Sequence, residues 1–223
     1  MVHQKGGAYL TQDGKLNFKD AIAWPLETFQ NYMKDGIIPP IEETIASSVD
    51  TLFMEGRAAM DATYNAMAAT LQAGAQKGHV YGITSIPGST TGDKLGTFVK
   101  GELAFCVNAG SKNKEEAVLL LNEFINNEDM GKVLKLVRGI PPSNKIRDII
   151  LTDMTDLDKG VFKVQQYADE SKDTPEPRFI KGWVAVITVI GKETENYEYG
   201  KKDLQTAIND MVSGAEKALG DAK

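Results

Sequence analysis

Several groups of residues have the types that catalysis or metal binding needs, but their spacing fits neither. Residues 88–94 are similar to a phosphate-binding loop, yet the spacing is one residue short and no Ser or Thr follows the lysine. Asp153, Asp156 and Asp158 suggest calcium ligands, but the glycine is misplaced for an EF-hand loop and no glutamate closes it. The two histidines lack metal-ligand spacing. We therefore expect no metal ion and no cofactor.

The remaining reactive groups also lack the partners that catalysis requires. Cys106 lies in the apolar stretch 103–107 with no histidine close by in sequence to act as its base, so we expect a small buried core residue. Adjacent carboxylates such as Glu42 and Glu43 point roughly 100° apart on a helix, so they cannot converge on one glycosidic bond. The sequence therefore predicts a protein that is not an enzyme.

Composition describes an ordinary globular chain and excludes one class of partner. The 223 residues are 42% hydrophobic and 25% charged, with a net charge of −6. The 25 basic residues are scattered, without the cationic stripe that phosphate contacts need, so we expect no nucleic-acid partner. The longest uncharged apolar run, residues 183–190, is far shorter than the roughly 20 residues of a membrane-spanning helix.

Hydrophobic periodicity predicts a helix-rich chain with few strands. We expect helices at residues 25–35, 41–53, 64–75, 128–137, 183–190, in pieces of 146–167, after Ser111, and at the C-terminal end. We expect strands at residues 57–60, 80–86 and 97–109. The helix after Ser111 should bury Ala117, Leu120, Leu121 and Phe124. The final helix should bury Leu204, Ile208, Met211 and Ala215.

Four segments in this order resemble the extracellular carbohydrate-binding proteins of ABC importers, the maltose-binding-protein type of solute-binding protein family 1. The first runs from the turn at residues 13–15 to Ile37, and the second, residues 52–60, is close to the family's F-x-x-G-x-A-A-M. The third is the stretch 101–107 followed by residues 110–117, close to the family's S-K-N-K-E-E-A. The fourth is Gly-Ile-Pro at 139–141, then Trp183 and a final helix. The resemblance covers residues 8–219.

The resemblance implies an α/β fold of the type II periplasmic-binding-protein class. Residues 1–83 and 146–223 would form a helix-rich C-terminal lobe, and residues 84–145 a segment of the N-terminal lobe. The N-terminal half of the parent would be absent together with its export signal, so the fold would be truncated. The parent would be extracellular, either as a cell-surface lipoprotein or in the periplasm.

The resemblance also implies a ligand site between lobes. The candidate ligand-binding residues are Trp183, Tyr64, Asn65, Thr63, Glu102 and Arg178. Trp183 lies where the family places an aromatic that stacks on a sugar, with a core tryptophan as the alternative. Residues 63–65 follow the Ala-Ala-Met segment, where family members often carry a glycine and a sugar-contacting tryptophan. This sequence departs there, with Ala66 and no Trp, and Tyr64 is the replacement aromatic or a packing residue.

Two of the candidates are charged and each has a plainer alternative. Glu102 would lie in the loop that faces the cleft, or it is an exposed carboxylate at the end of a strand. Arg178 would hold a hydroxyl or an acidic sugar, or it forms a surface salt bridge.

The implied function is to bind an extracellular carbohydrate and deliver it to an ABC transporter. The partners would be a sugar or oligosaccharide ligand and the permease subunits in the membrane. Two alternatives stay open. One is a saccharide-processing enzyme, for which no convergent acid and base is visible. The other is a ligand-presenting sensor subunit for a membrane kinase, which would use the same lobes.

Overall fold

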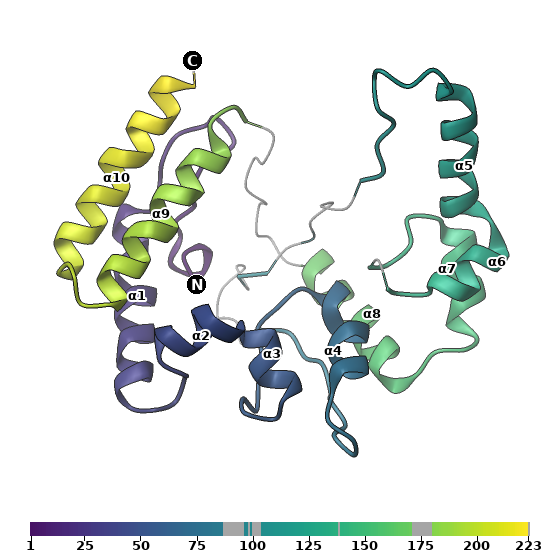
Figure 1. Ribbon diagram of the computed structural model, residues 1–223, viewed down its shortest axis with the longest axis horizontal. Coiled ribbons are helices and arrows are strands. Elements are labelled where there is room, and N and C mark those ends of the chain that lie inside the picture. The colour runs from purple at the N-terminus through teal and green to yellow at the C-terminus, as the bar shows by residue number, and fades with distance from the viewer. Residues whose placement is uncertain (87–95, 98, 100–103, 138, 171–179, 223) are drawn as a thin grey trace. The chain divides into compact units, whose positions relative to one another are not determined.

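The computed structural model describes residues 1–86, 96–97, 99, 104–137, 139–170 and 180–222 (Figure 1). The helices are α1 (Lys19–Lys34), α2 (Ile41–Ser47), α3 (Val49–Met54), α4 (Ala68–Gly74), α5 (Lys114–Asn126), α6 (Glu128–Leu134), α7 (Asn144–Leu151), α8 (Asp156–Glu170), α9 (Trp183–Glu198) and α10 (Leu204–Asp221), with 3-10 turns η1 (His3–Lys5) and η2 (Asn65–Met67). No helix in these ranges is long and apolar enough to cross a membrane. The fold is helix-rich, as predicted.

The chain divides into two compact units. Unit 1 comprises Met1–Val49, Ile86–Phe98 and Ser171–Lys223. Unit 2 comprises Asp50–Ser85 and Val99–Glu170. These boundaries follow contacts within the chain and differ from those of the expected lobes, so the division into lobes stays a prediction.

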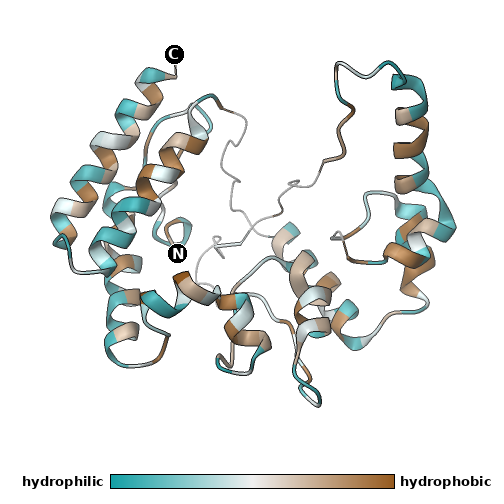
Figure 2. Ribbon diagram, in the orientation of Figure 1, coloured by the Kyte–Doolittle hydropathy of each residue, from teal (hydrophilic) through white to brown (hydrophobic). Residues whose placement is uncertain are grey.

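Unit 1 is organised around a helical hairpin. Helices α9 and α10 pack side by side and against α1 (Figure 1). Within α10, Ala207, Ile208, Met211 and Ala215 recur at helical spacing and are all buried, as the sequence predicts for Ile208, Met211 and Ala215. Leu204 packs at the edge of the same core. They meet Val186 and Ile190 of α9 and Ile22 and Leu26 of α1. Figure 2 shows the apolar bands of the two hairpin helices.

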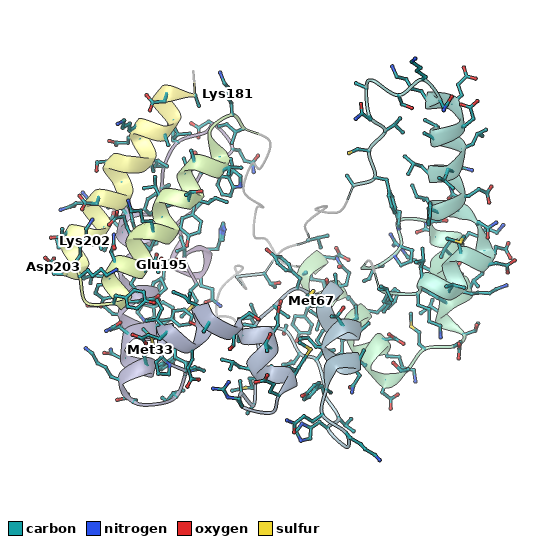
Figure 3. The ribbon with its side chains drawn as sticks, in the orientation of Figure 1. Met33, Met67, Lys181, Glu195, Lys202 and Asp203 are labelled. Atoms are coloured by element: carbon teal, nitrogen blue, oxygen red, sulfur yellow. The ribbon has the colours of Figure 1, made fainter. Side chains whose placement is uncertain are left out.

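The turn of the hairpin is fixed by polar groups. Asp203 caps α10, because its Oδ1 accepts a hydrogen bond of 2.9 Å from the Thr206 backbone amide. Lys202 donates to Glu193 of α9 and, at 2.7 Å, to Asp210 of α10, and so ties the two helices together. Figure 3 labels Lys202 and Asp203 in this turn.

Unit 2 has a smaller core. The buried residues of this core are Leu136, Ile146, Ile150 and Val161, which come from α7, α8 and the segment after α6. Ile140 and Phe162 are partly buried and pack on this core. Gly131 lies against Ile146, and a Cβ at Gly131 would come within 2.6 Å of the Ile146 Cγ2, so the glycine permits the close approach of α6 and α7.

The expected strands do not form within the described residues. Residues 57–60 and 80–86 are irregular, as are residues 104–108, and the isolated bridges found in the described part of the chain are Ala8–Asn17 and Val137–Gly139. A β-strand needs the backbone of a neighbouring strand to pair its amides and carbonyls, and the described residues offer none here. Tyr81 instead anchors its segment by donating a hydrogen bond of 3.0 Å to the Phe53 carbonyl.

Several helix predictions are wrong in their bounds; α9, for example, continues to Glu198 and does not end at residue 190. Helix α1 begins at Lys19 rather than at residue 25, because Ala21 and Ile22 are buried in the core and extend the helix by more than a turn. The expected helix at residues 41–53 is broken at Ser48, whose φ of 46° lies in the left-handed region. The break separates α2 from α3.

The predicted burial of α5 and of Cys106 is also wrong. No residue of α5 is buried, and Leu120 is 58% exposed, while Ala117, Leu121 and Phe124 are half-buried. Cys106 is exposed. Phe105 stacks on Phe124 at 5.8 Å between ring centroids, but it is itself 55% exposed. Periodicity identifies an apolar face correctly and leaves open whether another element covers it.

Candidate functional site

A hollow of about 430 Å³ opens on the surface of unit 2, a volume within the range of small-molecule sites. Its lining is Ile140, Arg147, Lys159, Phe162, Lys163, Gln165, Gln166 and Asp169. Two of these residues are apolar and six carry hydrogen-bonding groups. A second hollow of similar volume, near the junction of α5 and α6, is lined only by Asn, Glu, Asp and Lys side chains. The first therefore combines an apolar floor with a polar rim, and the second does not.

The floor of the first hollow is held by the core beneath it. Ile140 and Phe162 are half-buried and pack on the cluster of Leu136, Ile146, Ile150 and Val161. Gly139, just before Ile140, has a φ of +85°, a conformation that favours glycine and turns the chain toward α7. The Gly-Ile-Pro segment that stands out in the sequence thus supplies one apolar wall.

Arg147 is fixed in place by backbone carbonyls. Its Nε donates a hydrogen bond of 2.5 Å to the Pro141 carbonyl, and its Nη2 donates one of 3.4 Å to the Pro142 carbonyl. These bonds use part of the guanidinium fork and leave its other N–H groups for a ligand. Because the side chain is half-buried, the cation is oriented before any ligand arrives.

A chain of amides joins the hollow to the segment at residues 63–65. Asn65 Nδ2 donates a long hydrogen bond of 3.4 Å to Gln165 Oε1, and Gln165 Nε2 donates one of 3.2 Å to Asp169 Oδ1. Gln166 makes the equivalent bond of 3.1 Å to Glu170 one residue further along α8. A side chain 100 residues away in sequence is thereby positioned beside α8.

The structure brings together only part of the predicted set of ligand residues. Asn65 contacts Gln165 at the hollow, and Tyr64 and Thr63 precede it on the surface, with Tyr64 55% exposed. Glu102 and Arg178 lie outside the described residues. Trp183 belongs to unit 1, whereas Asn65 belongs to unit 2.

Trp183 is the first residue of α9, and its surroundings favour the packing alternative. The side chain is only 8% exposed. Gly182 before it has a φ of +88°, and a Cβ there would come within 2.9 Å of the Ala222 Cβ, so the start of α9 lies tightly against the end of α10. A ring in this position offers little surface to a ligand, and its stacking role stays a prediction.

One carboxyl of unit 2, close in sequence to Asn65, has an altered pKa. Asp61 lies three residues before Tyr64, and its burial raises its pKa to about 6, helped by hydrogen bonding and repulsion from Asp50. Its Oδ2 is buried and has no hydrogen-bond partner among the described residues. Since a group with this pKa is partly protonated near neutral pH, the Asp50–Asp61 pair responds to mild acidification.

The face of α8 that lines the hollow was not predicted from the sequence. Phe162, Gln165, Gln166 and Asp169 follow the i, i+3, i+4, i+7 spacing of one helix face. An aromatic and three polar groups on a single face are a signal that can be found in the sequence. No group of three or more His, Cys, Asp or Glu residues placed to hold a metal occurs in the described part of the chain.

Comparison with known proteins decides the family. Residues 1–148 match the profile of the bacterial extracellular solute-binding proteins, which is more than half of the chain. The chain belongs to this family. The matched range of this solute-binding protein contains Thr63, Tyr64, Asn65 and Arg147, while α8 and Trp183 lie beyond it. The resemblance found in the sequence is thereby confirmed.

A solved structure shows the same fold. The solute-binding protein is similar to an extracellular solute-binding protein of family 1 from Alicyclobacillus acidocaldarius subsp. acidocaldarius DSM 446, with a TM-score of 0.71 and 21% sequence identity. The match covers 98% of this chain and 56% of that one. At this identity the likeness is one of fold, and the chain spans little more than half the length of the solved protein.

Proposed function

We propose that this solute-binding protein is part of an extracellular carbohydrate receptor that delivers its ligand to an ABC permease in the membrane. The observation that carries the proposal is the hollow of unit 2, where Ile140 and Phe162 form an apolar floor and Gln165, Gln166 and Arg147 form a hydrogen-bonding rim. A sugar presents an apolar ring face and a rim of hydroxyls, which is the complementary pattern.

Planar amide and guanidinium groups suit hydroxyls because the amide donates and accepts, and the guanidinium donates, in a fixed plane. A site of this kind rejects analogues that lack the hydroxyls, since its own polar groups would then stay unpaired. Asn65, which follows Thr63 and Tyr64 in the chain, contacts the rim through its hydrogen bond to Gln165. These three residues remain our candidates for the ligand wall, and Phe162 is the better-placed aromatic in this unit.

The further parts of the proposal rest on the family and its fold. We propose the type II class of the fold, with lobes at residues 1–83 and 146–223 and at residues 84–145. We also propose an extracellular location, as a surface lipoprotein or in the periplasm. In the whole protein, we propose ligand contacts for three more residues, Glu102, Arg178 and Trp183. For Trp183 to stack on a sugar, its ring must first become exposed.

Calorimetry with a panel of mono-, di- and oligosaccharides tests the proposal on the 223-residue chain. At least one sugar should bind, and Phe162→Ala should weaken it about tenfold, because a stacked ring contributes roughly 1 kcal/mol beyond its buried area. Tyr167→Ala removes an aromatic from the same helix outside the hollow and serves as the control. Binding that is unchanged in Phe162→Ala would remove the hollow from the proposal. Turnover of a sugar, followed by mass spectrometry, would instead support a saccharide-processing enzyme.

A further inference from the structure

The hollow of unit 2 carries a local charge opposite to that of the chain. The chain has 31 acidic and 25 basic residues, yet the lining of the hollow contains Arg147, Lys159 and Lys163 against a single carboxylate, Asp169. An excess of cations on one concave surface of an acidic protein favours an anionic ligand there, because the field of the site attracts it.

The charged groups that line the hollow differ in whether they have an oppositely charged partner. Lys159 is paired with Asp156 at 3.1 Å, one turn back on α8. Asp169 accepts a hydrogen bond from the neutral amide of Gln165 and pairs with no cation in the described part of the chain. Arg147 and Lys163 likewise have no carboxylate partner among the described residues. Two cations at the hollow are thus left for a ligand.

Arg147 and Lys163 differ in how firmly they are held. Arg147 is held by the Pro141 and Pro142 carbonyls, so it presents its remaining N–H groups from a fixed position on one wall. Lys163 stands exposed on α8, on the wall that also carries Phe162. A planar carboxylate accepts parallel N–H donors from a guanidinium, while a lysine adds a mobile point charge.

We propose that the hollow selects a saccharide that bears an acidic group, a uronic acid in the first place, with Arg147 binding the carboxylate and Lys163 adding a second charge. This inference rests on the proposed function, since it takes the hollow to be a sugar site. Ile140 and Phe162 receive the apolar face of the ring, and Gln165 and Gln166 bind its hydroxyls. The acidic group alone distinguishes this ligand from a neutral sugar of the same shape.

Matched sugars test the inference by calorimetry on the 223-residue chain. Glucuronate and galacturonate should bind at least about tenfold more tightly than glucose and galactose. Raising the salt from about 0.05 M to 0.5 M should weaken the uronates and leave the neutral sugars unchanged, because ions screen only the charged contact. Glucose 6-phosphate forms a further arm: if it binds more tightly than glucuronate, the acidic group is a phosphate and the uronate assignment is overturned.

Two variants separate charge from structure. Lys163→Met should weaken uronate binding about threefold or more and should weaken neutral sugars clearly less, because only the uronate loses a charge contact. Arg147→Lys keeps the charge but loses the fork, and should weaken uronates about tenfold. Lys217→Met on α10 is the control and should change nothing.

The possible results distinguish this inference from the proposed function. If neutral sugars bind as tightly as uronates and Lys163→Met has no effect, the acidic-sugar inference is wrong and the carbohydrate site stands. If neither kind of sugar binds at up to about 10 mM, the site itself is wrong and the inference falls with it.

Discussion

Both units are built from helices, but the helices of unit 1 bury their apolar faces more completely than those of unit 2. In unit 1, α9 and α10 pack along one another and onto α1, and Val186, Met211 and Ala215 are completely buried. In unit 2, α5 buries no residue, and the core beneath the hollow has only four buried side chains. A helix stabilises a fold through the face it buries, so unit 1 should be the stable part of the chain. Unit 2 leaves more of its surface open to other contacts.

The two units also differ in how they treat a carboxyl group. In unit 1, burial alone would raise the pKa of Glu193, but hydrogen bonds from Lys202 and Asn196 outweigh it and the pKa is lowered. In unit 2, burial raises the pKa of Asp61 to about 6, and Asp50 adds repulsion instead of a cation. Glu193 therefore contributes stability in its charged form, and Asp61 in its protonated form. The same kind of side chain stabilises one unit at neutral pH and opposes folding in the other.

The largest expected effect tests the core of unit 1. Val186→Ala should lower the free energy of unfolding by about 2 kcal/mol, because two buried methyl groups are lost and a cavity remains. Val184→Ala, on the same helix but 71% exposed, should change it by less than about 0.5 kcal/mol. Both tryptophans, Trp24 and Trp183, lie in unit 1, so urea unfolding followed by tryptophan fluorescence reports this unit. Equal effects of the two variants would contradict the packing of the hairpin.

The next effect concerns the ionic contact between α9 and α10. Lys202→Met should lower the free energy of unfolding at pH 7, by less than Val186→Ala does, because Glu193 is 8% exposed and would lose its cation. Lys201→Met, the adjacent lysine, should be nearly neutral, since its Nζ only lies over the Tyr199 ring.

The pH dependence of the same contact has a definite sign. The folded pKa of Glu193 is lowered, so its stabilisation is present above the unfolded value near 4.5 and is lost as the pH falls through the folded value. Unfolding of Lys202→Met should therefore lose part of this acid dependence. A variant that keeps the full acid dependence would show that Lys202 does not set the pKa of Glu193.

A smaller pH dependence of stability, of opposite sign, is expected in unit 2. The folded pKa of Asp61 is raised, so its stabilisation is present at low pH and is lost as the pH rises through about 6. Asp61→Asn should therefore stabilise unit 2 above pH 6, by about 0.5 to 1 kcal/mol because the carboxyl is partly exposed to water. Far-ultraviolet circular dichroism during urea unfolding at pH 5 and pH 8 measures the difference. Asp148→Asn, on the exposed side of α7, should leave both values unchanged.

Much of the helical structure could be predicted from the sequence, and the reason is local. The stripe of Ile208, Met211 and Ala215 follows from apolar spacing alone, whereas the uncharged run that begins at Trp183 fits a buried strand or a helix by its pattern. Nothing in the local sequence marks the break at Ser48, and the early start of α1 depends on contacts of Ala21 and Ile22 with distant elements, which spacing does not contain. The expected strands fail for the same reason, because strand pairing is a property of two segments and not of one.

The candidate site was predicted only in part. The segment at Asn65 was singled out from its position after Ala-Ala-Met, and the structure places it beside Gln165. The lining face of α8 was missed: its i, i+3, i+4, i+7 pattern of one aromatic and three polar residues is present in the sequence, but the spacing alone does not show that Ile140 and Arg147 lie opposite it. Arg147 became informative only through its bonds to the Pro141 and Pro142 carbonyls.

The smallest expected effect on stability tests the open surface of unit 2. Leu119 and Leu120 of α5 are 67% and 58% exposed. Replacing both with serine should change the free energy of unfolding by less than about 0.5 kcal/mol, since little apolar area is removed from a buried position. An exposed apolar patch promotes association, so the same change should reduce self-association of the chain in light scattering at high concentration.

A matched change in unit 1 decides whether this effect belongs to α5. Val184→Ser alters an apolar side chain that is 71% exposed on α9, next to the buried Val186. If association depends on the α5 face, Val184→Ser should leave the scattering unchanged while the α5 variant lowers it. If both variants lower the scattering equally, any exposed apolar residue promotes association. The proposed difference between unit 1 and unit 2 would then be wrong. If the α5 variant instead lowers the free energy of unfolding by about 2 kcal/mol or more, as is typical when buried leucines are replaced, the α5 face is covered in solution.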